Sequence, residues 1–196
     1  MSKPIQVGIT GGIGVGKTLI THLFSLLGVP IYYADTRAKE LMNSVLVKPI
    51  IDTFGEEAFI NGTLNRDYLA SRVFINKSEI NKLNAIVHPA VAIDFNNWVS
   101  TQVKSTYIIK EAALLVETGS YKLLDKLILV VSPEELRINR IKKRDPFRSE
   151  TEIKGIISKQ TSDIEKSKFA DFIIINNEEE LLIPQVIKIN HLINSM

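Results

Sequence analysis

Eight residues near the start of the chain combine glycine, lysine and threonine in the pattern G-x-x-x-x-G-K-[ST]. A loop of glycines lets successive backbone N–H groups point at one spot, where the phosphates of a nucleotide can sit. The lysine of such a loop reaches the β- and γ-phosphates, and the hydroxyl after it is available to Mg²⁺. The pattern predicts a phosphate-binding P-loop, and the alternative is a glycine-rich turn without a ligand. Its residues are Gly11, Gly12, Ile13, Gly14, Val15, Gly16, Lys17 and Thr18, followed by Leu19 in a helix-like segment.

Acidic side chains are expected at the carboxyl ends of two strands, which is where open α/β sheets bind ligands. Asp35 follows the apolar run 30–34, so its carboxylate could accept a proton from an attacking hydroxyl. The same residue could instead cap the helix that follows, since aspartate is a preferred N-cap. Glu111 ends another run and could hold Mg²⁺ or a water molecule, a role for which Glu117 has less positional support.

Arginines recur at spacings of three and four between residues 137 and 144, which places them on one face of a helix. A run of charges of this kind is commonly a solvated face. Beside a P-loop, however, guanidinium groups can stabilise the charge on a transferred phosphoryl group. We therefore favour contact with phosphate for Arg140 and Arg144.

Short apolar runs alternate with longer amphipathic segments along most of the chain. The runs are nearly continuous, which is typical of strands buried on both faces of a parallel sheet. The segments between them have helical spacing, and Gly28 is expected to end the first helix. The alternation predicts an α/β fold with helices on both faces of the sheet. The predicted strands are 5–9, 30–33, 106–110, 126–131 and 172–175.

One stretch, from 36 to 102, interrupts the alternation because it offers no convincing buried strand. Insertions beside a P-loop sheet commonly shape the site of a second substrate, so this stretch is a candidate for that role. The pair His88-Pro89 should separate two of its helices, since the residue before a proline avoids helical geometry. The predicted helices of the stretch are 36–46, 66–73 after an Asn65 cap, 78–87 and 89–103.

Two capping-box signatures mark helix starts in the second half of the chain. Ser132-Pro133-Glu134-Glu135 predicts a helix over 133–143 with proline at its first position. Ser149–Glu152 repeats the signature. The polar residues 144–151 between these helices are expected to form a second, smaller insertion.

The composition is that of an ordinary globular protein and argues against several classes. The 196 residues are 45% hydrophobic and 23% charged, which favours a single domain with inserted lobes. A net charge of +2 gives no argument for a nucleic-acid partner, and no apolar run is long enough to span a membrane. The absence of cysteine suits a reducing compartment, so we expect a cytoplasmic protein.

Two short elements are similar to those of regulatory GTPases, namely Asp52–Gly55 (D-x-x-G) and Asn76–Glu79 (near N-K-x-D). The second has glutamate at its fourth position, and neither follows a buried parallel strand. Because a motif needs its structural context, we disfavour a GTPase.

The chain resembles the dephospho-CoA kinase family nearly from end to end. Each shared motif is weak alone, but their order and spacing together are specific. The shared residues are Thr10–Lys17, Ala34-Asp35, Phe54-Gly55, Leu64-Asn65-Arg66, Val73-Phe74, His88-Pro89, Leu114–Glu117, Arg140, Arg144, Gln160, Ala170-Asp171-Phe172 and Asn176.

The resemblance implies a fold and an activity. The expected fold is a P-loop core at 1–35 and 104–196 with a five-stranded parallel sheet, a helical CoA-binding insertion at about 36–103, and a small lid at about 140–155. The implied activity is transfer of the γ-phosphoryl group of ATP, with Mg²⁺, to the 3′-hydroxyl of dephospho-CoA, the last step of coenzyme A synthesis. The partners would be these small molecules, with neither nucleic acid nor membrane, and the protein would be a monomer or a small homo-oligomer.

The resemblance also implies roles for single residues. Asp35 would be the catalytic base, with Lys17 and Arg140 at the phosphates. Asn176 would lie near the adenine and complete an ATP site with residues 12–19, Arg140 and Arg144. Two positions depart from the family: Lys39 and Glu111 stand where arginine and aspartate are common, and a lysine offers a point charge in place of a two-pronged grip. The acceptor site would comprise Asp35, Lys39, Arg66, His88, Glu111 and Leu114.

Two other functions stay open at this point. One is another small-molecule or nucleoside-monophosphate kinase with the same core, which identification of the product would separate. The other is a nucleotide-binding switch, which measurement of turnover would separate.

Overall fold

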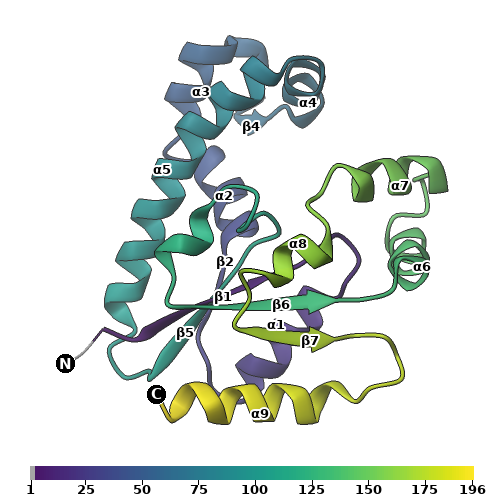
Figure 1. The fold of residues 1–196 in the computed structure, drawn as a ribbon. Helices are drawn as coiled ribbons and strands as arrows, with labels where there is room; N and C mark the ends of the chain where they lie inside the picture. The colour runs from purple at the N-terminus through teal and green to yellow at the C-terminus, as the bar shows by residue number, and fades with distance from the viewer. Residues whose placement is uncertain (1–2) are drawn as a thin grey trace. The chain divides into compact units, whose positions relative to one another are not determined.

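The computed structural model describes residues 3–196, except for the side chains of residues 73–75 and 77. The shared pair Val73-Phe74 therefore lies outside the described side chains. The chain divides into two compact units, residues 1–32 with 102–196 and residues 33–101, and each is described by itself (Figure 1).

The first unit is built on a five-stranded sheet with the strand order β2-β5-β1-β6-β7 (Figure 1). Strand β1 runs parallel to β5 and to β6, and β6 runs parallel to β7. The predicted parallel sheet is confirmed, and each strand matches its expected range to within one residue at either end. The strands are β1 Ile5–Thr10, β2 Ile31–Tyr33, β5 Tyr107–Glu111, β6 Lys126–Val131 and β7 Phe172–Ile175.

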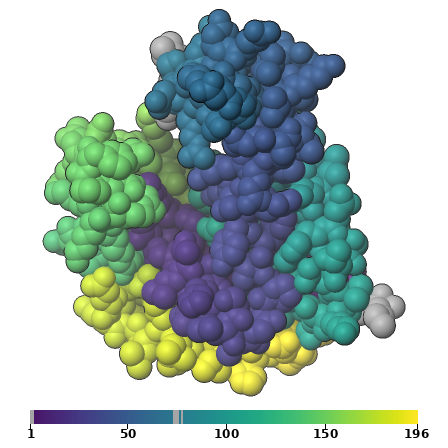
Figure 2. Space-filling model, turned by 180° about the vertical axis from the view of Figure 1, so that it is seen from behind, coloured from purple at the N-terminus to yellow at the C-terminus, as the bar shows by residue number. Residues whose placement is uncertain are grey.

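Helices α1 (Lys17–Leu26) and α9 (Leu182–Asn194) pack on each other and on the apolar side chains of this sheet. Their buried residues join Val7 and Ile9 of β1 in one core cluster. In the space-filling view, the yellow atoms of α9 lie against the purple atoms of the N-terminal segment (Figure 2). Gly28 ends α1 in a left-handed conformation with a φ of 83°, as predicted. This packing holds β1, and with it the start of the loop that follows.

Three further helices of the first unit follow β6: α6 Glu134–Arg144, α7 Glu150–Ser158 and α8 Asp163–Ser167. The predicted capping box of Ser149 at the start of α7 is confirmed. The predicted capping box at Ser132 is wrong, because α6 begins at Glu134 with Pro133 as its N-cap residue. The hydroxyl of Ser132 instead accepts a hydrogen bond from Arg140 at 3.0 Å.

The second unit is largely helical, with a core around Ile50, Phe54 and Leu69. Asn65 caps its helix as predicted, since the side-chain oxygen accepts from the N–H of Tyr68. The elements α3, η1 and the β3–β4 hairpin lie outside the predicted helices, and strands of two residues are too short to show alternation. The elements are α2 Ala34–Met42, α3 Val47–Phe54, η1 Glu56–Ala58, β3 Phe59–Ile60, β4 Thr63–Leu64, α4 Arg66–Ile75 and α5 Lys77–Thr101.

Helix α5 runs through Pro89 without a break, so the prediction of two helices separated at His88-Pro89 is wrong. A proline inside a helix removes one backbone hydrogen bond and costs roughly 3 kcal/mol. Apolar residues on both sides of it, Val87 and Val91 among them, pack into the core of this unit. Because helices in proteins are stabilised mainly by tertiary packing, these contacts outweigh the local signal.

Candidate active site

The P-loop motif forms the connection between β1 and α1. Gly14 and Gly16 have φ values of 81° and 92°, a left-handed conformation that side chains disfavour. The ammonium of Lys17 donates to the carbonyl oxygens of Gly11 at 2.9 Å and Gly12 at 3.2 Å, so it lies over the loop. This order of strand, glycine loop and helix is the one that binds phosphate at the N-terminus of a helix.

Side chains from three distant segments hold the backbone of this loop. Asn176 directly follows β7 and donates from its buried amide to the carbonyl of Val15 at 2.8 Å. Arg137 of α6 donates to the carbonyl of Ile13 at 2.9 Å. The N–H of Ile13 donates to the side-chain oxygen of Gln160 at 2.9 Å. In agreement with these contacts, the green atoms of α6 and α7 lie beside the purple N-terminal segment (Figure 2).

The sequence analysis favoured Arg140 and Arg144 of α6 and did not identify Arg137 as a residue that contacts the loop. Its side chain is buried, and it lies on the side of the helix that also carries the buried residues Ile138 and Ile141. That spacing of one and four marks an inward-facing side and could have identified this arginine as the buried member of the run.

Arg140 and Arg144 have different surroundings. Arg140 donates to the side-chain oxygen of Asn176 at 3.2 Å and pairs with Glu178 at 3.0 Å, so it joins the loop through Asn176. Arg144 is turned to its neighbour Asp145 at 2.8 Å, and its side chain is 62% exposed. Their hydrogen bond raises the pKa of Arg144 and lowers the pKa of Asp145. The structure thus brings Arg140, but not Arg144, into the network around the loop.

An exposed carboxylate joins α6 to α7. Glu150 accepts from Lys142 at 3.0 Å and lies 2.9 Å from Lys154. Hydrogen bonds from Lys154 and Lys142 lower the pKa of Glu150 to about 2. The link is therefore present at neutral pH and is lost only as the pH falls from the usual pKa of a glutamate toward this value.

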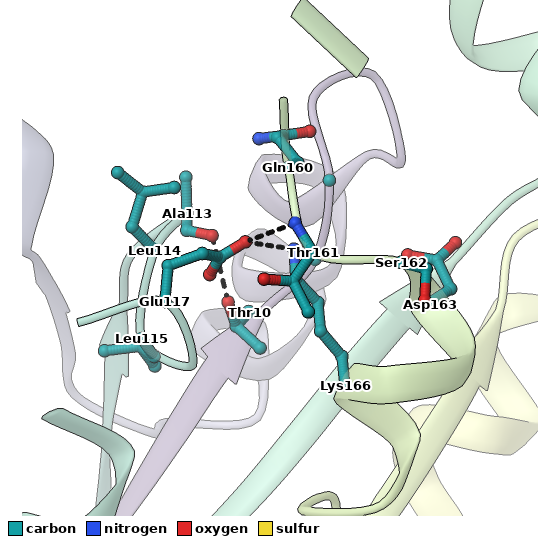
Figure 3. A network of polar contacts seen from close by, with 12 residues as sticks. Thr10, Ala113, Leu114, Leu115, Glu117, Gln160, Thr161, Ser162, Asp163 and Lys166 are labelled. Carbon is teal, nitrogen blue, oxygen red and sulfur yellow. Dashed lines mark hydrogen bonds and ion pairs between the residues drawn. The ribbon is translucent and has the colours of Figure 1, made fainter. Parts of the chain in front are cut away.

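The last residue of β5, Glu111, and the segment after that strand carry two predicted site residues. Glu111 is buried and lies opposite Ile9 in the pairing of β5 with β1. The hydroxyl of Thr10 donates to the carbonyl of Ala113 at 3.2 Å, which joins the end of β1 to this segment (Figure 3). Leu114 is 47% exposed, so its side chain is available to a ligand.

Four of the predicted site residues belong to the second unit, and all four are exposed. Asp35 lies in the first turn of α2, whose N-cap residue is Tyr33, so the alternative that Asp35 caps this helix is wrong. Lys39 follows one turn later on the same face of α2. Arg66 begins α4, and His88 lies within α5.

Thr18 and Glu111 are the residues expected to hold Mg²⁺. Among the described residues, no group of three or more histidine, cysteine, aspartate or glutamate side chains could hold a metal ion by itself. Magnesium commonly takes one or two protein ligands together with phosphate oxygens and water. The exposed hydroxyl of Thr18 in the first turn of α1 and the carboxylate of Glu111 fit that donor set.

The fold and the site define the class of protein as a P-loop kinase, a nucleotide-binding transferase. The defining features are the parallel sheet, the glycine loop that opens a helix, the lysine over that loop and the adjoining helix with its arginines. Comparison with known proteins narrows the class. The family model described as dephospho-CoA kinase matches residues 5–181. The chain therefore belongs to the dephospho-CoA kinase family. Its reaction is the ATP-dependent phosphorylation of the 3′-hydroxyl of dephospho-CoA, which completes coenzyme A synthesis.

Individual relatives agree with this assignment. A dephospho-CoA kinase of Bacteroides fragilis is 38% identical over 187 residues, which cover 94% of this chain and 91% of the relative. A dephospho-CoA kinase structure from Campylobacter jejuni is 26% identical, with 97% of each chain covered and a TM-score of 0.71. The crystal structure of TT1252 from Thermus thermophilus is 28% identical, with 97% of this chain and 98% of that chain covered and a TM-score of 0.89.

Proposed function

We propose that the P-loop binds the triphosphate of ATP and that Asp35 is the general base of the phosphoryl transfer. The conformation of the loop supports the first assignment, since Gly14 and Gly16 allow backbone N–H groups to converge beside Lys17. The exposed carboxylate of Asp35 supports the second, since it lies in a helix that already has another N-cap residue. This exposed acid, two residues after the end of β2, is the observation that carries the assignment of a base.

In the proposed reaction, the 3′-hydroxyl oxygen of dephospho-CoA bonds to the γ-phosphorus of ATP. The bond from that phosphorus to its bridging oxygen breaks, and ADP leaves. The hydroxyl proton passes to Asp35. Lys17 and Arg140 stabilise the charge on the transferred group, because fixed cations act strongly where water is excluded. Thr18, with Glu111 as a further ligand, would hold Mg²⁺, which would supply charge neutralisation at the phosphates.

For the acceptor we propose exposed side chains of the second unit, and we assign Glu111 and Leu114 of the first unit to the same substrate. Asp35 and Lys39 share one face of α2, and Lys39 offers a positive charge to a substrate phosphate. Arg66, His88 and Leu114 are exposed and available for further contacts. In this assignment residues 36–103 form the CoA-binding lobe and residues 140–155 the lid.

The location and the oligomeric state remain predictions. We expect a cytoplasmic protein that is a monomer or a small homo-oligomer. Among the described helices, none combines the length and the hydropathy that crossing a bilayer requires. Light scattering on the purified chain would measure its mass in solution against the 22.0 kDa of one copy.

A coupled assay of ATP consumption tests the proposed site. The acceptors are dephospho-CoA, coenzyme A, adenosine and AMP, and mass spectrometry identifies the product. We expect turnover with dephospho-CoA to exceed that with the other three and to require Mg²⁺. Turnover of wild type that persists after removal of Mg²⁺ by a chelator would contradict the metal assignment.

A further inference from the structure

Both backbone groups of Ile13, in the middle of the P-loop, are held by side chains from elsewhere in the first unit. The carbonyl accepts from the Nε of Arg137 at 2.9 Å. The N–H donates to the Oε1 of Gln160 at 2.9 Å. Arg137 also lies within 3.5 Å of that Gln160 oxygen, so the two side chains form one clamp around a single loop residue.

The clamp sets the direction of the loop's N–H groups. A peptide group is planar and trans, so its C=O and its N–H point in opposite directions. Because Arg137 holds the carbonyl of Ile13, the N–H of Gly14 in the same peptide group points away from Arg137. Asn176 has the same effect on the peptide group between Val15 and Gly16. It holds the carbonyl of Val15, so the N–H of Gly16 points away from Asn176. The hydrogen bonds to these two carbonyls thereby fix the directions of two N–H groups of the loop.

The guanidinium of Arg137 is buried and has fixed partners. Its side chain is 8% exposed, and its Nη1 lies 3.8 Å from the carboxylate of Asp163 in α8. Gly12 gives it room, because a Cβ at that position would overlap the guanidinium. A charge this buried needs fixed partners, and these are the Ile13 carbonyl, Gln160 and Asp163.

An ion pair with a fully buried lysine fixes the segment that carries Gln160. Lys166 of α8 is 0% exposed, and its Nζ lies 2.9 Å from the Oε1 of Glu117. The same oxygen accepts from the N–H of Thr161, the residue after Gln160 (Figure 3). Displacing Glu117 would leave the buried ammonium of Lys166 without its partner, so this contact resists displacement.

We propose that Arg137 and Gln160 are positioning residues of the kinase: they clamp Ile13 so that the loop presents its N–H groups to the phosphates of ATP before ATP arrives. This inference rests on the proposed binding of ATP by the P-loop. Arg137 lies in the first half of α6, and Gln160 lies just after α7. Side chains near both ends of the α6–α7 segment therefore contact the same loop residue.

Calorimetric titration with ATP in the absence of acceptor tests the clamp. Gln160→Leu removes the acceptor of the Ile13 N–H and should weaken ATP binding about tenfold, whereas Gln160→Glu keeps an acceptor oxygen and should restore most of it. Arg137→Met should have an effect of at least the same size, with partial recovery in Arg137→Lys. The KM for dephospho-CoA should stay within about twofold of wild type, because the clamp acts on the nucleotide loop.

Lys126→Met is the matched control, since Lys126 also belongs to the first unit and its side chain pairs with Asp171 at 3.1 Å outside the proposed site. It should bind ATP as wild type does. Wild-type ATP affinity in both Gln160→Leu and Arg137→Met would overturn the inference. The variant Lys17→Ala distinguishes a failure of the clamp from a failure of the proposed function. If Lys17→Ala also binds ATP with wild-type affinity, the assignment of the P-loop as the ATP site fails.

Amide hydrogen exchange by NMR tests the same geometry without any substitution. Without nucleotide, the N–H of Ile13 should exchange slowly, because Gln160 holds it. The N–H groups of Gly14 and Gly16 should exchange fast and become protected when ATP is added. Exchange of Ile13 as fast as that of Gly14 in the free protein would overturn the inference.

Discussion

The side-chain amide of Asn176 donates to the carbonyl of Val15 at 2.8 Å, and Asn176 is 6% exposed. Asn176→Leu keeps the size of the side chain but cannot donate, so the carbonyl of Val15 loses its partner. We expect a loss of about 1–3 kcal/mol in the free energy of unfolding, together with weaker ATP binding. Urea unfolding and ATP titration measure the two effects. An unfolding free energy equal to that of wild type would show that water replaces the amide.

Lys17→Ala should abolish turnover while the fold survives. The ammonium contacts the carbonyls of Gly11 and Gly12 on the loop, and an alanine removes this charge from the phosphates without opening a hole in the core. Initial rates and thermal melting check this. A melting temperature that collapses together with the activity would mean that Lys17 is structural.

Asp35→Asn should separate binding from chemistry. Asparagine keeps the size of the side chain but cannot take up the proton of the acceptor hydroxyl. General-base catalysis contributes about 10²- to 10⁴-fold, so kcat should fall by roughly that factor while the affinity for ATP stays near wild type. The loss should lie toward the low end if proton removal comes late in a loose transition state.

Asp52→Asn is the control for Asp35→Asn, because it also neutralises an exposed carboxylate of the second unit and should leave kcat unchanged. Near-wild-type kcat in Asp35→Asn would direct the search for the base to Glu111.

Gly12→Ala should weaken ATP binding, because the new methyl group would overlap the guanidinium of Arg137 and force it away from Ile13. Gly155→Ala is the matched control for adding a methyl group, since no atom lies within 4 Å of a Cβ at that position of α7. It should raise the melting temperature slightly, as alanine favours a helix. Thermal melting and ATP titration compare the two, and equal ATP affinities would contradict the predicted overlap.

Glu117→Gln should destabilise the fold by about 3–5 kcal/mol, because the fully buried ammonium of Lys166 would keep its charge without its partner. The double variant Lys166→Met with Glu117→Gln should recover much of that loss, since it removes both charges. Urea unfolding of the four proteins in this cycle measures the coupling between the two side chains. Additive losses would show that the pair contributes nothing beyond its separate members.

Much of the fold could be predicted because its signals are local. Residues 127–131 are all apolar, and in the structure they form most of strand β6, with Leu127–Val130 buried. The P-loop could be predicted because its glycines, lysine and threonine are consecutive, and so their joint geometry follows from one turn of chain. The caps at Asn65 and Ser149 were predictable for the same reason, since each side chain reaches an N–H only three residues away.

Contacts between distant segments could not be predicted in this way. Ser132 has the local pattern of a cap, but the α6 arginine that folds back beside it uses its hydroxyl instead. Pro89 has the local pattern of a helix break, but packing on both sides keeps α5 continuous. Asn176 and Val15 are 161 residues apart, and spacing along a chain carries no information at that range. The sequence by itself determined the sheet and the loop, whereas only the tertiary structure decided which side chains hold that loop, because burial and long-range packing choose the partners of each polar group.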